Sequence, residues 1–138
     1  MPSFRLDVAP DIAEIPRLND WIEVCCEEAG VVGDVVFKLT LAIEEAVTNV
    51  IQHAFTGAPP PHRIEVTLGI DAERVIAEVI DNGHPFDPSE AAEPDRAAPL
   101  EERDVGGLGI HLIRRMMDEV EYRRIAGENR LRLQKMRR

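Results

Sequence analysis

Residues 34–55, DVVFKLTLAIEEAVTNVIQHAF, carry the longest helical pattern of this sequence. Gly33 and Asp34 supply a start signal, and three consecutive prolines at 59–61 follow its end. Apolar side chains recur at the spacing of a helix with one buried face, namely Val36, Leu39, Ile43, Val47, Val50 and Ala54. The stretch therefore predicts a long amphipathic helix that packs on the core and ends at Phe55.

Strand patterns lie on both sides of this helix. Before it, apolar and polar residues alternate over 4–8, and a further helix is expected from Ile12 to Ala29. After it, alternation at 64–68 and 75–80, with a turn at 71–73, predicts an antiparallel hairpin.

The last part of the chain again passes from a helix to strands. A helix is expected to follow the glycines at 106–109 and to run through Met117. Two strands come next, with Gly127-Glu128-Asn129 as their turn. The order βααββαββ predicts an α+β fold, a two-layer sandwich in which a mixed, mostly antiparallel sheet packs against helices.

Length and composition exclude several classes of protein. The 138 residues fit a single domain over 1–138. The net charge of −10 disfavours nucleic acid binding through phosphate neutralisation. Uncharged runs are far shorter than the roughly 20 apolar residues of a membrane helix, so the sequence predicts a cytoplasmic protein that binds no membrane. The adjacent Cys25 and Cys26 fit small buried side chains rather than a disulfide framework or a zinc knuckle.

Charge is distributed unevenly along the chain. Residues 101–138 carry 10 basic and 7 acidic side chains, whereas the rest of the chain is strongly acidic. Such asymmetry is typical of a docking surface for an acidic partner or an anionic ligand. A solvated face with dispersed charges is the alternative.

The predicted long helix also carries a polar pair. Glu45 and Asn49 are one turn apart and lie away from the apolar stripe, beside Ala42 and Ala46. These small neighbours leave room for a ligand next to the carboxylate and the amide. A solvated helix face is the alternative for these residues taken alone.

A second polar cluster, Asp81 to Pro88, follows directly on the predicted strand at 75–80. Asp81 can accept a hydrogen bond from an exocyclic amine, and Gly83 lets the backbone approach a flat ring because it has no Cβ. A plain turn is the alternative, since Asn-Gly is a common turn dipeptide.

A third cluster, Gly106-Gly107-Leu108-Gly109-Ile110, stands where the last helix is expected to begin. Free N–H groups at a helix N-terminus, with glycines beside them, suit phosphate oxygens. The cluster matches neither the P-loop nor the Rossmann pattern, and a flexible hinge is the alternative. The preceding segment, Pro88 to Asp104, has no apolar period and is predicted to be a lid.

Together, in this order, the three clusters resemble those of the GHKL ATPase superfamily, and within it the small bacterial anti-sigma-factor serine/threonine kinases. Residues 45–49, EAVTN, are similar to the N box of that superfamily. Residues 81–88 are similar to its first glycine box in the Asp-Asn-Gly-x-Pro-Phe form, and 107–109 to its second. The resemblance covers nearly the whole chain and implies a histidine-kinase-like ATPase fold that uses Mg-ATP.

The resemblance also implies roles for the helix residues. Asn49 would place its side-chain oxygen on Mg²⁺, which prefers oxygen ligands and retains several waters. Glu45 would accept the proton of an attacking hydroxyl as general base. His53, one turn beyond Asn49, either shapes the pocket or is an ordinary helix histidine.

The two glycine boxes would bind the rest of the nucleotide. The resemblance implies that Asp81 recognises the adenine amino group, with Gly83 and Phe86 lining the base. The residues implied to bind phosphates as the lid closes are those of the second box, Gly107, Leu108 and Gly109.

The implied function is that of an anti-sigma factor and kinase, which transfers the γ-phosphoryl group of ATP to a Ser or Thr of an anti-anti-sigma antagonist. A sigma factor would be the second partner, and a homodimer is also implied. An ATP-binding module that sequesters a partner without transfer is the alternative, and slow ATP hydrolysis that drives a conformational cycle is a third reading. Glu45 favours transfer, whereas Val105, where the subgroup often has Arg, favours sequestration. The threonine that the family often has near adenine has no obvious counterpart between Gly127 and Leu133.

Overall fold

The computed structural model describes residues 2–88 and 105–138. Every strand and α-helix expected from the sequence is present. The predicted lid lies outside the described residues, apart from its first residue, Pro88. The elements are β1 (Ser3–Val8), η1 (Ile12–Glu14), α1 (Ile15–Glu28), α2 (Asp34–Asn49), η2 (Val50–Ala54), β2 (Ile64–Ile70), β3 (Arg74–Asp81), α3 (Val105–Met116), β4 (Glu119–Ile125) and β5 (Glu128–Met136).

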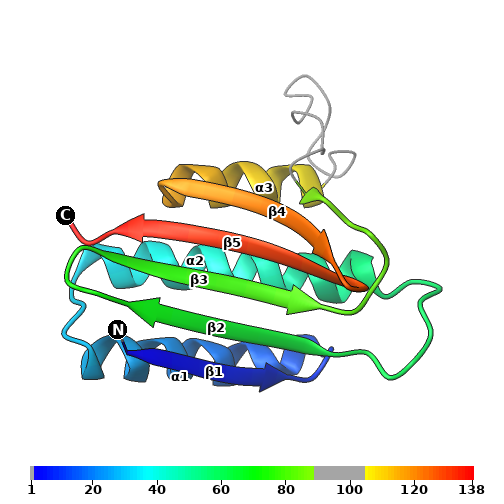
Figure 1. Ribbon diagram of the computed structural model, residues 1–138, viewed down its shortest axis with the longest axis horizontal. Helices are drawn as coiled ribbons and strands as arrows, with labels where there is room; N and C mark the ends of the chain where they lie inside the picture. The colour runs from blue at the N-terminus through cyan, green and yellow to red at the C-terminus, as the bar shows by residue number, and fades with distance from the viewer. Residues whose placement is uncertain (1, 89–104) are drawn as a thin grey trace.

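The five strands form one sheet in the order β1-β2-β3-β5-β4. All four pairings of these described strands are antiparallel, so the mixed, mostly antiparallel sheet that was expected is here antiparallel throughout. In Figure 1, α1 and α2 run behind the sheet, and α3 lies near β4. This arrangement confirms the α+β two-layer fold.

Strand alternation gives the sheet an apolar inner face. Ile64, Val66 and Leu68 of β2 are at most 2% exposed, while the residues between them are only half-buried. They belong to the same core as Leu39 and Ile43 from the apolar stripe of α2. Each such side chain contributes about 1.5–3 kcal/mol when fully buried, so this layer holds α2 in a fixed position over the sheet.

Both predicted helices before the hairpin are divided in two. The first begins as the 3₁₀ turn η1, which Asp11 caps through a hydrogen bond accepted from Ala13 N at 2.9 Å. The second is α-helical only to Asn49 and continues as the π-helical turn η2. A π turn breaks the regular hydrogen-bond ladder of the α-helix. The carbonyl of Ala54, at its end, accepts a hydrogen bond from His84 N at 2.8 Å.

The turn between the last two strands lies earlier than predicted. It consists of Ala126 and Gly127, and the expected turn Gly127-Glu128-Asn129 is wrong because β5 already begins at Glu128. Both turn residues have positive φ, 51° and 80°, as the favoured two-residue hairpin turns require. Asn129 is therefore a strand residue, and it pairs with Asp81 of β3.

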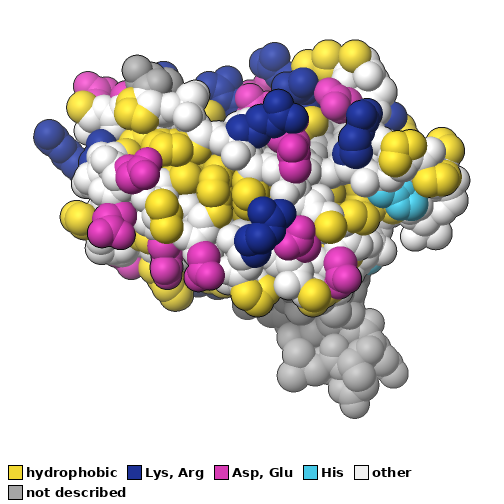
Figure 2. Space-filling model, turned by 90° about the horizontal axis from the view of Figure 1, so that it is seen from below, with side chains coloured by type: hydrophobic (Ala, Val, Ile, Leu, Met, Phe, Trp, Pro, Cys, Tyr) yellow, Lys and Arg dark blue, Asp and Glu magenta, His cyan; other side chains and the backbone are white. Residues whose placement is uncertain are grey.

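Two basic residues near the C-terminus, Arg123 and Arg130, lie beside acidic side chains. Arg130 lies 3.6 Å from Glu78 and 3.1 Å from Glu128, and Arg123 lies 2.7 Å from Glu121. Figure 2 shows the same mixture of both signs on the lower side of the molecule. The structure thus favours dispersed charges over a single basic docking surface.

Helices that could span a membrane are absent from residues 2–88 and 105–138.

Candidate functional site

The three polar clusters of the sequence meet beside α2. Asn49 and Asp81, 4% and 3% exposed, line one cavity between α2 and β3. Gly109 of α3 faces the same helix: a Cβ added to it would lie 3.1 Å from Oε2 of Glu45 and 3.1 Å from Nδ2 of Asn49. The fold therefore joins Asp81, Asn49, Glu45 and Gly109 in one continuous site.

The polar face of α2 is buried, so the alternative of a solvated helix face does not apply to Asn49. Ala42 and Ala46 are 0% and 2% exposed and keep the helix surface beside the polar pair flat. Nδ2 of Asn49 is buried and has no hydrogen-bond partner among the described residues. A buried amide without a partner costs about 1–3 kcal/mol, which fits an atom that is satisfied by a ligand.

Glu45 is half-buried one turn before Asn49. Burial raises the pKa of the Glu45 carboxyl above its ordinary value of 4.5, and the charge of the neighbouring Glu44 raises it further. A carboxylate with a raised pKa is a stronger base, which is the direction that proton abstraction requires.

Asp81 ends β3 with its side chain on the inner face of the sheet. Its Oδ1 accepts two hydrogen bonds, from Gly83 N and from Asn129 Nδ2, each at 2.9 Å. Burial raises the pKa of the Asp81 carboxyl above 3.8, although these two hydrogen bonds act in the opposite direction. Among the described residues no donor contacts Oδ2, which leaves that oxygen for a ligand.

Gly83 lies against the end of the π-helical turn. A Cβ at this position would lie 2.7 Å from the carbonyl carbon of Ala54 and closer still to its oxygen. In real structures a Cβ atom essentially never lies within 3.0 Å of another non-bonded heavy atom. Only glycine allows the segment after Asp81 to pass this close to η2, a tighter constraint than a plain turn imposes.

Phe86 lines the cavity and stacks on a second aromatic ring. Phe86 is half-buried, and the ring of the exposed His53 stacks on it with centroids 5.5 Å apart and planes at 24°. His53 thus contacts a residue of the cavity lining without lining the cavity itself. Gly107 and Leu108 lie in the first turns of α3, so the second glycine cluster is already helical.

Three site residues were missed by the sequence reading. Asn129 is 3% exposed and hydrogen-bonds to Asp81, and Tyr122 and Arg124 of β4 both donate to its Oδ1, at 2.6 and 3.2 Å. A signal existed: Asn129 is in phase with Leu131, which faces the core of β5. A polar residue in phase with buried ones points to an internal hydrogen bond.

The cavity at Asp81 and Asn49 is small, about 20 Å³. This is room for little more than one water-sized sphere. A purine needs far more, so nucleotide binding requires this cavity to be wider than it is in the structure.

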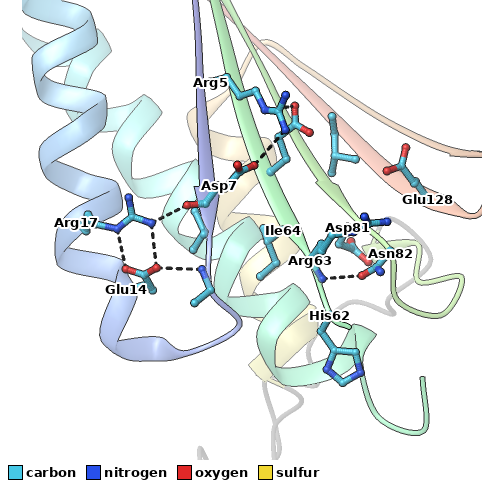
Figure 3. Close-up of a pocket in the computed structure, with 14 residues that line it drawn as sticks. Arg5, Asp7, Glu14, Arg17, His62, Arg63, Ile64, Asp81, Asn82 and Glu128 are labelled. Atoms are coloured by element: carbon cyan, nitrogen blue, oxygen red, sulfur yellow. Dashed lines mark hydrogen bonds and ion pairs between the residues drawn. The ribbon is translucent and has the colours of Figure 1, made fainter. Parts of the chain in front are cut away.

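A larger cleft of about 550 Å³ lies where β1, β2 and β3 meet the start of α1 (Figure 3). Its charged side chains are largely paired with one another: Arg17 lies 2.8 Å from Glu14, and Arg5 lies 3.1 Å from Glu65. Asp81 is the one predicted site residue in its lining. The smaller cavity is therefore the better candidate for the functional site.

The donor set at Asn49 fits Mg²⁺. An amide oxygen beside a half-buried carboxylate is a hard-oxygen environment. Oδ1 of Asn49 would bind the metal, and the orphaned Nδ2 could donate to a phosphate oxygen. Clusters of three or more His, Cys, Asp or Glu able to hold a metal are absent from the part of the chain that the structure describes. A magnesium ion here would thus take most of its other ligands from phosphates and water.

Comparisons with known sequences agree with this geometry. A family model described as histidine kinase-like ATPase domain matches residues 8–135. Serine/threonine-protein kinase BtrW of Bordetella bronchiseptica is 38% identical over 97 residues, which cover 70% of this chain and 68% of that protein. Serine-protein kinase RsbW of Listeria monocytogenes is 30% identical over 123 residues, 86% of this chain and 76% of that protein.

Solved structures resemble this chain in fold. The crystal structure of the RsbU and RsbW domains of Rv1364c from Mycobacterium tuberculosis superposes with a TM-score of 0.68 and 16% identity. The match covers 99% of this chain, which spans 33% of that longer chain. The histidine kinase domain of a blue-light activated histidine kinase from Erythrobacter litoralis matches 90% of this chain with a TM-score of 0.55.

Proposed function

Because this chain belongs to the histidine kinase-like ATPase domain family, we propose that it is an anti-sigma factor and ATP-dependent serine/threonine kinase. Its substrate is an anti-anti-sigma antagonist, to which it transfers the γ-phosphoryl group of ATP. Two relatives that share 30% and 38% identity with it are named as serine or serine/threonine kinases. The observation that carries the proposal is that Asp81, Asn49, Glu45 and Gly109 share one site.

The adenine base lies in the cavity between α2 and β3. Asp81 Oδ2 accepts a hydrogen bond from its amino group, while Gly83 and Phe86 lie along the ring. The triphosphate extends along α2 towards the start of α3, where Gly107, Leu108 and Gly109 would lie against its oxygens and the free N–H groups of the first turn would bind them. Asn49 would hold Mg²⁺, which when bound would neutralise charge at the phosphates.

Glu45 acts at the far end of this path. Its carboxylate accepts the proton of the Ser or Thr hydroxyl while the hydroxyl oxygen bonds to the γ-phosphorus. The bond from that phosphorus to the bridging oxygen breaks, and ADP leaves. Positioning and charge neutralisation dominate such transfers, so a single carboxylate suffices as base.

Label transfer tests the proposal. The protein is incubated with γ-labelled ATP, Mg²⁺ and a candidate antagonist encoded beside it, and both nucleotide binding and labelled antagonist are measured. We expect Glu45→Gln to bind ATP like the wild type and to lose at least about 100-fold in transfer. Glu44→Gln, on the adjacent position of α2, is the matched control and should transfer label normally. Equal transfer by Glu45→Gln and the wild type would refute the general-base role.

A sequestering module without phosphoryl transfer is the second candidate. It is favoured by Val105, which stands where an arginine for the terminal phosphate would be expected. In that case the wild type binds ATP and the antagonist but transfers no label, and Glu45→Gln behaves identically.

Protein partners are part of the proposal. Besides the antagonist, we propose a cytoplasmic sigma factor and a second copy of the chain as partners. Phe37, Val32 and Val24, at 64%, 78% and 54% exposure around the junction of α1 and α2, supply apolar surface for such contacts. Analytical ultracentrifugation of the protein alone and with each partner separates these assemblies.

A further inference from the structure

Asn129 is an exceptionally well-connected side chain in the described core. It is 3% exposed and lies opposite Asp81 in the antiparallel pairing of β3 and β5. Its Nδ2 donates to Asp81 Oδ1 at 2.9 Å and to the backbone oxygen of His84 at 2.5 Å. One amide group thus contacts both the carboxylate and the backbone of the segment that follows it.

The oxygen of the same amide accepts three hydrogen bonds. They come from Phe86 N at 3.1 Å, from the hydroxyl of Tyr122 at 2.6 Å and from Arg124 Nη1 at 3.2 Å. Acceptors surround Nδ2 and donors surround Oδ1, so the amide has only one orientation that satisfies its partners. A second bond of Arg124, to the oxygen of Gly83 at 2.8 Å, ties the same segment to β4.

We propose that Asn129 is a positioning residue for base recognition. By holding Oδ1 of Asp81, it directs Oδ2 into the cavity and so sets the preference for a purine that carries a 6-amino group. It also fixes the backbone from Gly83 to Phe86, and Phe86 lines that cavity. The inference rests on the proposed function, because it needs ATP as the ligand.

Few other side chains can replace this amide. A threonine has one hydroxyl proton and cannot donate to both Asp81 and His84 O. An aspartate would place a second carboxylate against Asp81, which the low dielectric of the core makes costly. An alanine leaves Oδ1 of Asp81 with the single donor Gly83 N, and the carboxylate is then free to rotate.

The test compares two nucleotides that differ only in the 6-amino group. Dissociation constants are measured by calorimetry, in the presence of Mg²⁺, for ATP and for purine riboside triphosphate, which lacks that group. The full chain is used as wild type, Asn129→Ala, Tyr122→Phe and Asn82→Ala. The last is the matched control: Asn82 follows Asp81 directly, but its amide contacts Arg63 N at 2.7 Å (Figure 3) and Pro61 O at 2.8 Å, and not Asp81.

We expect the wild type to prefer ATP by at least about tenfold, the value of a hydrogen bond to a charged group. In Asn129→Ala the affinity for ATP should fall about tenfold while that for the analogue changes less than about threefold, so the preference disappears. Tyr122→Phe, which keeps Asn129 but removes one bond to its oxygen, should lower the preference about threefold. Asn82→Ala should keep the full preference.

Two results would overturn the inference, and they differ from one another. If Asn129→Ala weakens both nucleotides equally and keeps the preference, Asn129 is only structural; should that variant fail to fold, an unchanged preference in Tyr122→Phe has the same meaning. If the wild type binds neither nucleotide, the proposed function fails, and the inference fails with it.

Discussion

Gly109 of α3 lies next to Glu45 of α2. A Cβ added to Gly109 would lie only 3.1 Å from the carboxylate oxygen Oε2 of Glu45. Nδ2 of Asn49 is equally near that point. The start of α3 and the polar face of α2 therefore touch where the terminal phosphate is proposed to lie. A side chain at 109 would compete with both functional groups for the same space.

Replacement of Gly109 by alanine should lower the phosphoryl-transfer activity without lowering the stability of the fold. Alanine favours a helix over glycine by about 1 kcal/mol, and the crowded atoms are ends of flexible side chains, so the free energy of unfolding should not fall. Phosphoryl transfer should fall at least about tenfold, because Glu45 and Asn49 are displaced by a few tenths of an ångström. Thermal unfolding and label transfer on the same preparation check both statements, and a stable variant with normal transfer would contradict them.

Asp81→Asn should bind ATP poorly and yet fold well. The asparagine Oδ1 can still accept from Gly83 N and Asn129 Nδ2, whereas its NH₂ group would face the adenine amine as a second donor. We expect the ATP affinity to fall about 100-fold, as measured by calorimetry.

The difference in free energy of unfolding between Asp81→Asn and the wild type should depend on pH. The pKa of Asp81 is raised by burial, so its ionisation destabilises the folded state above the folded pKa and has no such effect below the unfolded value of 3.8. Asp81→Asn should therefore exceed the wild type in free energy of unfolding at pH 7. Denaturant titrations should show this advantage shrinking as the pH falls towards 3.8.

Transfer activity should have an acidic limb set by Glu45. Its carboxyl has a pKa above 4.5, and only the deprotonated form accepts a proton, so kcat/KM should fall as the pH falls through that raised pKa. Glu44→Gln removes a neighbouring charge that contributes to the shift, and the limb should then move to lower pH. A profile whose limb stays in place in Glu44→Gln would argue against Glu45 as the titrating base.

Gly83→Ala should destabilise the protein more than Gly33→Ala. The first change forces a Cβ into the carbonyl of Ala54 and threatens the bond from His84 N, for which we expect a loss of about 2–4 kcal/mol. Gly33 has φ of +71° and ψ of −139° but nothing within 4 Å of its added Cβ, so only backbone strain of about 1–3 kcal/mol applies. Urea unfolding of both variants measures the difference, and equal losses would mean that the close approach at Gly83 is not the constraint.

Local periodicity was enough to determine most of the secondary structure. The apolar stripe of 34–55 predicted a helix because burial at a spacing of three to four residues is possible only on one helical face. The alternation at 64–68 and 75–80 predicted the hairpin in the same way. The same signals could not show the change to a π turn after Asn49, since the apolar spacing continues through it.

The three polar clusters were also visible in the sequence, but the sequence did not show that they lie next to one another in the fold. Glu45, Asp81 and Gly109 are brought together by the packing of α2 on the sheet and of α3 on α2. Only that packing decides that Asn49 is buried with an unpaired amide and that the cavity lies on its side of β3.

Asn129 marks the boundary between what the sequence determined and what the tertiary structure decided. By itself the sequence determined a strand near Leu131 and Leu133, but a polar residue next to Gly127 reads equally well as part of the turn. The hairpin register places it opposite Asp81, and the packing of the sheet on the helices buries it. Once it is buried, its amide needs hydrogen-bond partners inside the protein. A buried polar group without a partner loses its hydrogen bonds to water and destabilises the fold by more than a single hydrogen bond contributes in net terms.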